Sequence, residues 1–363
     1  MRYRIDGILQ EKLVLPKKTH DAVVSRVKIL AELKIDERRV PQDGRFTFKV
    51  EDQEVDLRVS TLPTVDGEKI VMRLLRKSSN VPTLAELGFR GMALKNIEDA
   101  IKVPHGIVLI TGPTGSGKTT TLYSVLHALN TPKVNIVTLE DPVEYQIDGV
   151  NQVQINPKAG LTFATGLRSF LRQDPNIIMV GEIRDNETAD LAIQASLTGH
   201  LVFATLHTNS AAGALPRLLD MQAEPFLLAS SMTCVLAQRV LRQVCSNCKE
   251  SYTPDPATVT ELKRVLGPIY ETYVTKNNGQ IPKLYRGRKC EACAESGYKG
   301  RLGIFEVLKI NEKIGKLILG RSPASEIENM AVAEGMLLME QDGYVKALDG
   351  LTTLEEVMRV AKT

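Results

Sequence analysis

One glycine-rich segment constrains the fold of this chain more than any other feature. Residues 112–119 read GPTGSGKT, and they follow an apolar run at 107–111 and precede a helical pattern. A segment of this kind turns consecutive backbone amides, and the positive end of the next helix, toward an anion such as a nucleotide phosphate. The segment therefore predicts a phosphate-binding loop between a buried strand and a helix. The alternative is a glycine-rich turn without a ligand, and the two flanking patterns argue against it.

Two residues at the end of this loop carry side chains suited to a nucleoside triphosphate and its metal ion. We expect Lys118 to contact the β and γ phosphates and the Thr119 hydroxyl to bind Mg²⁺. ATP and Mg²⁺ are therefore the expected cofactors. The predicted nucleotide-binding residues are Gly112, Pro113, Thr114, Gly115, Ser116, Gly117, Lys118, Thr119 and Thr120.

Four short apolar runs alternate with helical patterns, as in a mostly parallel sheet covered by helices. The runs are 107–111, 135–139, 177–180 and 201–206. Each run ends in polar residues, and ligands of open α/β sheets bind at the carboxyl ends of the strands. We therefore expect the functional side chains to lie at that edge of the sheet.

Acidic side chains follow two of these runs. Glu140, Asp141 and Glu144 follow the second run, and Glu182 follows the third. Phosphoryl transfer needs groups that orient the attacking water and hold Mg²⁺, and a carboxylate at the end of a buried strand needs a cation or a donor. Glu140, Glu144 and Glu182 are thus candidate catalytic residues. Helix caps or solvated turns are the alternative explanation for each of them.

Two histidines, His200 and His207, flank the fourth run. We expect that strand to lie beside the phosphate loop, so that both histidines contact the γ phosphate and respond to its loss. An ordinary structural role is the alternative for each histidine.

Four of the five cysteines form two C-x2-C pairs, Cys245 with Cys248 and Cys290 with Cys293. Two pairs of this spacing favour a tetrahedral structural zinc site, since the four thiolates complete the coordination and leave no open position. The segment between the pairs is long enough for a helix, which we expect at 259–266. Four unrelated buried thiols are the alternative, and Cys234 is expected to be a core residue.

The first 88 residues or so predict a small α/β module. Runs at 46–50 and 55–59 alternate apolar and polar residues, with a turn at 51–54, so they predict a hairpin. A small, polar segment at 78–82 predicts a linker. A helix capped by Thr19 is expected to pack on the sheet through Val23, Val27 and Leu30.

Composition and the amino terminus limit the compartment and the partners. No stretch approaches the roughly 18 uninterrupted apolar residues of a membrane-spanning helix. The first residues lack the pattern of a secretory signal, which predicts a cytoplasmic protein. The net charge of +3 is too small to indicate nucleic-acid binding. Residues 1–7 are typical of a strand interior, so we also expect a truncated or unusually short chain.

The phosphate loop, the acidic segment 138–144, the segment 179–185 and the strand between the histidines occur in this order. Together they resemble the secretion ATPases of type IV pili and type II secretion, and the similarity covers essentially the whole chain. The resemblance implies an α/β protein with a RecA-like P-loop ATPase core and ATP sites between the domains of a homo-hexamer. The implied domains are a PAS-like α/β domain at 1–88, the core at 89–244, a tetracysteine zinc subdomain at 245–293 and a helical region at 294–363.

The resemblance also suggests roles for individual residues. It assigns Glu182 to the Walker B position and the catalytic base to Glu144 ahead of Glu140. Gly181 stands where most P-loop enzymes carry an aspartate, which implies that magnesium is held less directly. Five arginines are implied to reach ATP from this subunit or a neighbour, where positive charge would stabilise the transition state. Surface ion pairing is the alternative for each. The five are Arg58, Arg73, Arg168, Arg172 and Arg217.

The function implied by the resemblance is a motor that hydrolyses ATP. It would power assembly of pilin or pseudopilin fibres through an inner-membrane platform protein, from the cytoplasmic face of that membrane. Residues 156–163 and 169–175 favour pilus extension over type II secretion, and the tetracysteine segment argues against pilus retraction. A nucleic-acid translocase and a nucleotide-gated scaffold are the alternatives from other classes, although no direct contact with nucleic acid is expected.

Overall fold

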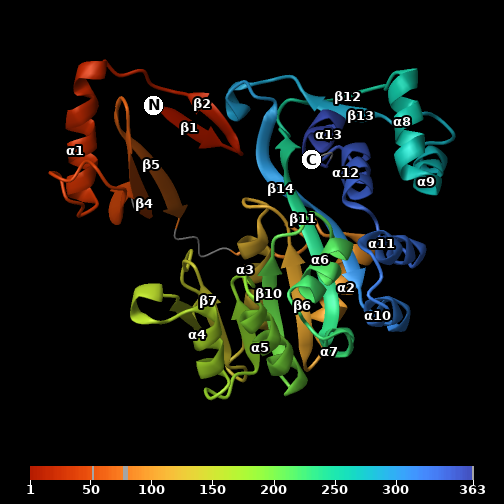
Figure 1. Ribbon diagram of the computed structural model, residues 1–363. Helices are drawn as coiled ribbons and strands as arrows, with labels where there is room; N and C mark the ends of the chain where they lie inside the picture. The colour runs from red at the N-terminus through yellow and green to blue at the C-terminus, as the bar shows by residue number, and fades with distance from the viewer. Residues whose placement is uncertain (51–52, 77–80, 362–363) are drawn as a thin grey trace. The chain divides into compact units, whose positions relative to one another are not determined.

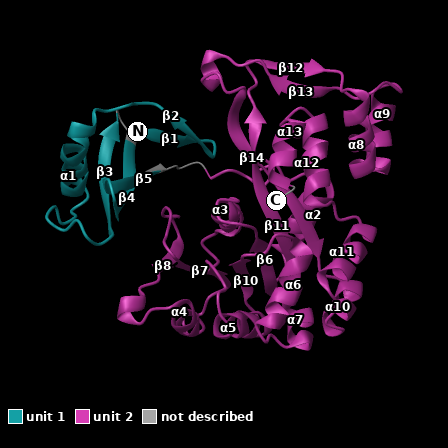
Figure 2. Ribbon diagram, turned by 45° about the horizontal axis from the view of Figure 1, so that its top comes forward, with its two compact units in different colours: residues 1–80 teal, residues 81–363 magenta. Residues whose placement is uncertain are grey.

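Residue 80 separates two structural units of the chain, Met1–Asn80 and Val81–Thr363 (Figure 2). The computed structural model describes residues 1–50, 53–76 and 81–361. The predicted linker at 78–82 falls on this boundary, but its residues 78–80 lie outside the described residues. The first unit ends before residue 88, where the sequence predicted the end of the first domain.

The amino-terminal unit is built on a three-stranded antiparallel sheet in the order β3-β4-β5 (Figure 2). The predicted hairpin is confirmed, because β3 and β4 pair antiparallel, with Phe46 opposite Leu57. Turn residues 51–52 lie outside the described residues. The bounds are β1 Arg2–Ile5, β2 Ile8–Glu11, a short 3-10 helix Lys17–Thr19, α1 His20–Leu30, β3 Gln42–Val50, β4 Gln53–Thr64 and β5 Gly67–Arg76.

Helix α1 differs from the predicted helix in its cap and in its buried face. The Thr19 hydroxyl donates to the Pro16 carbonyl at 2.8 Å rather than capping the helix. Val24 and Lys28 are the buried residues of α1, while Val23 and Leu30 are exposed, so the predicted apolar face is wrong. The Lys28 ammonium lies 2.6 Å from the Glu68 carboxylate, and this pairing permits its burial.

The second unit contains a seven-stranded sheet in the order β14-β11-β6-β10-β9-β7-β8. Figure 1 labels β14, β11, β6, β10 and β7 of this sheet. The neighbours from β11 to β8 pair in parallel, and β14 pairs antiparallel with β11. All four predicted strands are confirmed, in β6, β7, β9 and β10. The bounds are β6 Gly106–Thr111, β7 Ile136–Glu140, β8 Val150–Gln154, β9 Ile177–Val180, β10 Leu201–Leu206, β11 Met232–Val244 and β14 Tyr298–Lys309.

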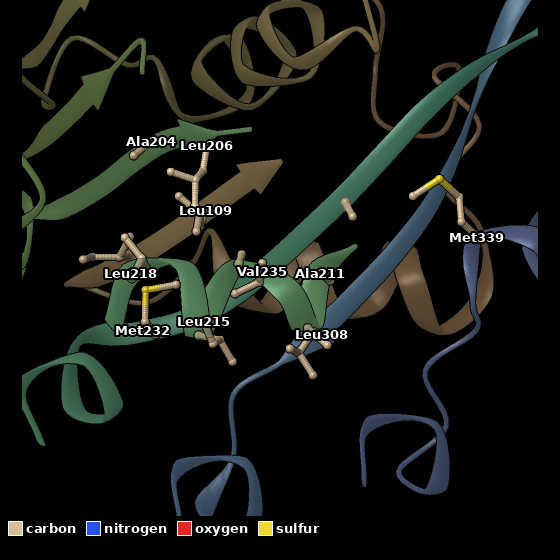
Figure 3. Packing of buried hydrophobic residues seen from close by; sticks show 14 of the residues in the cluster. Leu109, Ala204, Leu206, Ala211, Leu215, Leu218, Met232, Val235, Leu308 and Met339 are labelled. Atoms are coloured by element: carbon tan, nitrogen blue, oxygen red, sulfur yellow. The ribbon is translucent and has the colours of Figure 1, made fainter. Parts of the chain in front are cut away.

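Apolar residues on both faces of this sheet are buried by helices. In β6, Ile107 and Leu109 belong to the cluster that includes α4, α5 and α6, while Val108 and Ile110 belong to the cluster that includes α2 and α3. Leu215 and Leu218 of α6 contribute to the first cluster, near Leu109 (Figure 3). The bounds are α2 Gly91–Ala100, α3 Lys118–Leu129, α4 Phe163–Phe170, α5 Asn186–Leu197, α6 Ala211–Asp220 and α7 Pro225–Ser231.

The remaining elements follow β11. The predicted helix at 259–266 is confirmed within α8, and a second helix, α9, follows it. Residues 294–363 are not wholly helical, because β14 joins the core sheet. In the described part of the chain, no helix combines the length and apolarity needed to cross a bilayer. The bounds are β12 Lys249–Tyr252, α8 Pro256–Leu266, α9 Pro268–Lys276, β13 Leu284–Gly287, α10 Glu312–Leu319, α11 Ala324–Ala333, α12 Met339–Leu348 and α13 Leu354–Ala361.

A buried carboxylate fastens the last helix, α13, to β11. Glu356 accepts hydrogen bonds from the Arg242 guanidinium at 2.7 Å, from the Arg242 backbone amide at 3.0 Å and from Arg359 Nε at 2.9 Å. Burial alone would raise the pKa of Glu356, but these hydrogen bonds outweigh it and lower the pKa to about 2. The ionised form is therefore favoured by folding.

We expect Glu356→Gln to lower the free energy of unfolding at neutral pH by about 1–3 kcal/mol. The folded-state pKa is lowered from 4.5, so the contribution is present above pH 4.5 and is lost as the pH falls toward about 2. Denaturant unfolding at a series of pH values should show the wild type and the variant converging over that window. The exposed neighbour Glu355 provides the control, since Glu355→Gln should change the free energy of unfolding little. A difference that stays constant with pH would contradict the prediction.

Candidate nucleotide and metal sites

The glycine-rich segment forms a tight loop between the end of β6 and the start of α3. Gly112, Gly115 and Gly117 have positive φ values of 146°, 82° and 88°. A Cβ atom at Gly112 would lie 2.5 Å from the Gln238 carbonyl oxygen, so only glycine fits there. The loop therefore has the backbone shape of an amide cradle at a helix amino terminus. Pro113, Thr114, Thr119 and Thr120 are exposed, and Ser116 is buried.

Lys118 is the first residue of α3, and its side chain folds back over the loop. Its ammonium donates to the Gly112 carbonyl at 2.7 Å and to the Pro113 carbonyl at 3.3 Å. Partial burial lowers the pKa of Lys118, and the Glu182 carboxylate acts in the opposite direction. This electrostatic coupling links the loop to the carboxylate at the end of β9. The side chain thus supplies a positive charge at the cradle.

Glu182 lies at the centre of a charged group that joins three strand ends. One carboxylate oxygen lies 2.9 Å from His207 Nε2, and the other accepts from Arg184 Nε at 2.6 Å. Arg184 also lies 3.6 Å from the Asp141 carboxylate. Residues after β7, β9 and β10 are thereby brought together, at the carboxyl edge predicted from the sequence.

Gly181 has no room for the aspartate that most P-loop enzymes carry at this position. Its backbone amide donates to the Leu139 carbonyl at 2.7 Å, and a Cβ atom would lie 2.8 Å from the same oxygen. A side chain at this position would therefore push β9 away from β7. The next residue along the chain, Glu182, carries a carboxylate.

Glu140 is almost completely buried, and its carboxylate accepts hydrogen bonds from neighbouring side chains. One of its oxygens accepts from Thr138 Oγ1 at 2.6 Å and from Gln152 Nε2 at 3.1 Å, and the other accepts from the Tyr123 hydroxyl. Tyr123 lies on α3, so the carboxylate ties the helix after the phosphate loop to the acidic segment. Both oxygens of the Glu140 carboxylate therefore already have hydrogen-bond donors within the chain.

Glu144 is half-buried and lies closer to solvent than Glu140. Its backbone amide donates to the Tyr123 hydroxyl at 3.3 Å. Tyr123 therefore contacts both candidate glutamates of the acidic segment and orients that segment relative to α3. Burial, and next the charge of Glu140, raise the pKa of Tyr123, so the hydroxyl remains a donor at neutral pH.

The two histidines lie at opposite ends of β10. Leu201 pairs with Gly106 and Leu206 pairs with Thr111, so His207 lies at the phosphate-loop end and His200 at the other end. His200 Nδ1 contacts the Ala195 carbonyl at 2.8 Å. The strand between them spans roughly 20 Å at 3.3 Å per residue. The expected contact of His200 with the γ phosphate in the loop of the same chain is therefore wrong.

The three arginines of the second unit lie on helices α4 and α6 or just after α4. Arg168 forms an ion pair with Glu187 of α5. Arg172 donates to the Arg168 carbonyl at 2.9 Å and to Ser169 Oγ at 3.4 Å. Arg217 is exposed on α6. All three are surface residues that a neighbouring molecule can reach.

Arg58 and Arg73 belong to the amino-terminal unit. They lie directly opposite each other on β4 and β5, and Arg45 of β3 lies opposite Arg58. Residues paired in this way project from the same face of the sheet, so one face carries a row of three arginines. The pairing places both predicted arginines on one face of the sheet.

The four predicted cysteine ligands form one cluster. Their sulfur atoms all lie within 4.8 Å of one another. The Sγ–Sγ distance is 3.9 Å from Cys245 to Cys290, 3.9 Å from Cys248 to Cys293 and 3.7 Å from Cys290 to Cys293. A regular tetrahedron with Zn–S bonds of about 2.3 Å has edges of about 3.8 Å. The cluster therefore fits a tetrahedral metal site.

The pairing of β12 with β13 brings the two C-x2-C turns together. Lys249, which follows Cys248, lies opposite Gly287, and the Arg288 amide donates to the Cys248 carbonyl at 2.9 Å. Burial acts to raise the pKa of Cys293, but backbone amides of Cys290 and Gly297 point at its sulfur and lower the pKa to about 6. Metal binding needs the thiolate, which these two amides favour at Cys293.

Sequence reasoning missed three residues that organise the nucleotide site. They are Arg184, which bridges Glu182 and Asp141; Tyr123, which holds the acidic segment; and Gln238, which contacts the phosphate loop. Arg184 lies two positions after the candidate carboxylate Glu182, within the segment 179–185. No local pattern marks Tyr123 or Gln238, because their partners are distant in sequence.

A parallel sheet with the phosphate loop after a central strand, and with carboxylates at the neighbouring strand ends, defines a P-loop nucleotide-binding protein with a RecA-like core. Residues 1–359 match the family described as type II/IV secretion system protein, and the chain belongs to that family. The predicted fold class, with its amino-terminal α/β part and its clustered cysteines, is confirmed.

Several known proteins are similar to this chain over nearly its whole length. The type IV pilus assembly ATPase PilB of Thermus thermophilus is 51% identical, over 99% of this chain and 39% of its own length. The type II secretion system protein E of Pseudomonas aeruginosa is 48% identical, over 100% and 70%. The structure of the pilus retraction motor PilT with bound ADP gives a TM-score of 0.64 at 26% identity, covering 99% of this chain and 89% of that one. The chain thus spans well under half of the PilB relative.

Proposed function

We propose that this chain hydrolyses ATP and works as the motor of a homo-hexamer that powers assembly of type IV pilin or pseudopilin fibres. It would act through an inner-membrane platform protein, at the cytoplasmic face of that membrane, without crossing the membrane itself. The observation that carries the proposal is the phosphate loop, with Lys118 electrostatically coupled to the Glu182–His207 pair. The name of the Thermus relative favours pilus assembly.

The loop residues 112–120 would hold ATP, with the amides and Lys118 on the phosphates and the Thr119 hydroxyl on Mg²⁺. Bound Mg²⁺ would neutralise charge on the β and γ phosphates. Glu182 would face this ion through its waters, and His207 would respond to loss of the γ phosphate. Glu144 is the proposed catalytic base, because Glu140 is engaged with Tyr123, Thr138 and Gln152. Zn²⁺ would fill the cysteine cluster as a structural ion.

The arginines would supply further positive charge to the transition state. Arg58 and Arg73 would act from the amino-terminal unit, and Arg168, Arg172 and Arg217 from the core of the same or a neighbouring subunit. Their surface positions support a role across a subunit boundary. Type II secretion is the second candidate, and the 48% identity to the Pseudomonas protein favours it.

Phosphate release by the purified protein, measured with Mg-ATP at low and moderate salt, tests this proposal. We expect turnover that accompanies a hexameric sedimentation coefficient and that does not respond to added DNA. Stimulation by DNA with a steep salt dependence would instead favour a nucleic-acid translocase. Nucleotide binding without turnover in the assembled protein would favour a nucleotide-gated scaffold.

A further inference from the structure

Gln238 contacts the phosphate loop from a strand that is remote in sequence. Its Nε2 donates to the Ser116 carbonyl at 2.7 Å across a separation of 122 residues. The side chain is only 2% exposed, so the hydrogen bond is shielded from water. Ser116 lies between the loop's first glycine and Lys118, and the bond therefore fixes the part of the loop just before the helix.

The sheet register explains why Gln238 reaches this point. In the parallel pairing of β11 with β6, Ala237 is opposite Thr111, the last residue of β6. Gln238 and Gly112 are the next residues along the two chains. A Cβ atom at Gly112 would lie 2.5 Å from the Gln238 carbonyl, and one at Gly117 would lie 3.2 Å from Gln238 Nε2. Gln238 thus lies against the loop at Gly112 and at Ser116–Gly117.

Of the two polar groups of the Gln238 side-chain amide, the N–H group is hydrogen-bonded and the oxygen is not, among the residues that the structure describes. Gln238 Oε1 and the Ser116 hydroxyl are both buried without a hydrogen-bond partner in the described part of the chain. A buried polar atom without a partner costs roughly 1–3 kcal/mol. A hydrocarbon side chain of similar length would fill the same space without that cost. The N–H group of the same amide, by contrast, has its partner in the loop, at the Ser116 carbonyl.

We propose that Gln238 is a positioning residue for nucleotide binding, which holds the loop at Ser116 so that its amides face the phosphates. The proposal rests on the proposed binding of ATP at this loop. Gln238 acts through the loop and not on the nucleotide itself. Because a preformed loop binds substrate and transition state alike, loss of the donor should weaken nucleotide affinity much more than it slows the bound complex.

Replacing Gln238 by methionine keeps the length of the side chain and removes the donor. We expect Gln238→Met to bind Mg-ADP about tenfold more weakly, which corresponds to one hydrogen bond of about 1.4 kcal/mol. The KM for ATP should rise by a similar factor, while kcat should change less than about threefold. Gln243→Met is the matched control, since Gln243 lies on the same strand beyond the loop contact and should bind nucleotide like the wild type.

A second variant distinguishes the effect of the hydrogen-bond donor from the effect of side-chain shape. In Gln238→Glu, the protonated carboxylic acid can donate to the Ser116 carbonyl, whereas the carboxylate repels it. Burial raises the pKa of such a group. Relative to the wild type at each pH, the affinity of Gln238→Glu for Mg-ADP should therefore recover as the pH is lowered from 8 to 6. The relative affinity of Gln238→Met should not change over that range.

Each outcome decides between defined alternatives. Wild-type affinity for Mg-ADP in folded Gln238→Met, or a loss of kcat at unchanged KM, would overturn the inference while leaving the proposed function intact. An absence of nucleotide binding by the wild type would overturn the proposed function instead. If Gln238→Met does not give a cooperative thermal transition, the pH series on Gln238→Glu decides, and affinity that does not recover with acid counts against the inference.

Discussion

Lys118→Ala should reduce ATP turnover by about 10²- to 10³-fold or more, the largest effect that we expect from any single substitution in the core. The Lys118 ammonium already lies at the loop, 2.7 Å from the Gly112 carbonyl, so it needs little reorganisation to meet the phosphates. Residues 112–120 contain no other lysine or arginine that could replace this positive charge. The substitution also leaves the Glu182 carboxylate without the positive charge that faces it from α3.

Phosphate release at saturating Mg-ATP, with Mg-ADP titration alongside it, measures this effect. Lys133→Ala is the matched control, because Lys133 is an exposed lysine of the same unit. The thermal transition of Lys118→Ala should stay close to that of the wild type, since the side chain contributes little to the core. Turnover within a few fold of the wild type would show that hydrolysis happens elsewhere.

Cys293→Ser should remove the metal ion and destabilise the segment from Cys245 to Gly297. Structural zinc sites contribute about 10–16 kcal/mol of apparent binding free energy at neutral pH, so loss of one of four thiolates has a large effect. Cys293 is the best choice because amides of Cys290 and Gly297 point at its sulfur. A serine oxygen is a poorer ligand for zinc than this thiolate.

Elemental analysis of the purified protein should find one zinc ion per chain in the wild type and far less in Cys293→Ser. Protease digestion should then cleave the variant first between β12 and β13. Cys234→Ala provides the control, because Cys234 is buried in the core and lies outside the cluster, so zinc content should not change. A Cys293→Ser protein that retained its metal and its protease resistance would exclude this site.

Continuous apolar runs made the central sheet readable from the sequence. Strands β9 and β10 have the predicted bounds of 177–180 and 201–206 because helices bury both faces, so every residue of each strand is apolar or uncharged. The phosphate loop and the cysteine pairs were equally clear, since their residue types and spacing are dictated by the ligand. The edge of the sheet on which the candidate residues lie followed from strand direction alone.

Features that depend on contacts between segments far apart in the sequence could not be predicted in the same way. Strand β5 lacks regular alternation, with Ile70, Val71 and Met72 consecutive, and it is defined by its ladder with β4. The buried face of α1 includes Lys28, which a hydrophobic pattern assigns to solvent until Glu68 is known to lie beside it. His200 was misplaced because a strand brings only one of its ends to the ligand.

Strand β14 was missed for a related reason. Its partner β11 is separated from it by the whole cysteine-containing segment, and only the antiparallel ladder from Cys234–Lys309 to Val244–Tyr298 shows that they are neighbours. Gln238 follows from the same ladder and from the pairing of β11 with β6. The organisation of the loop thus depends on residues whose relationship is visible only in three dimensions.

The antiparallel pairing of β11 with β14 also affects how the sequence between these strands can evolve. The backbone leaves the core sheet after Val244 and returns at Tyr298, directly opposite, and the Cys245 amide donates to the Gly297 carbonyl at 3.0 Å. Residues 245–297 therefore form the connection between two antiparallel strands, β11 and β14. Segments whose ends lie this close together can be gained or lost with little disturbance of the host domain. The segment from Cys245 to Gly297 can therefore change in length without shifting the register between β11 and β14.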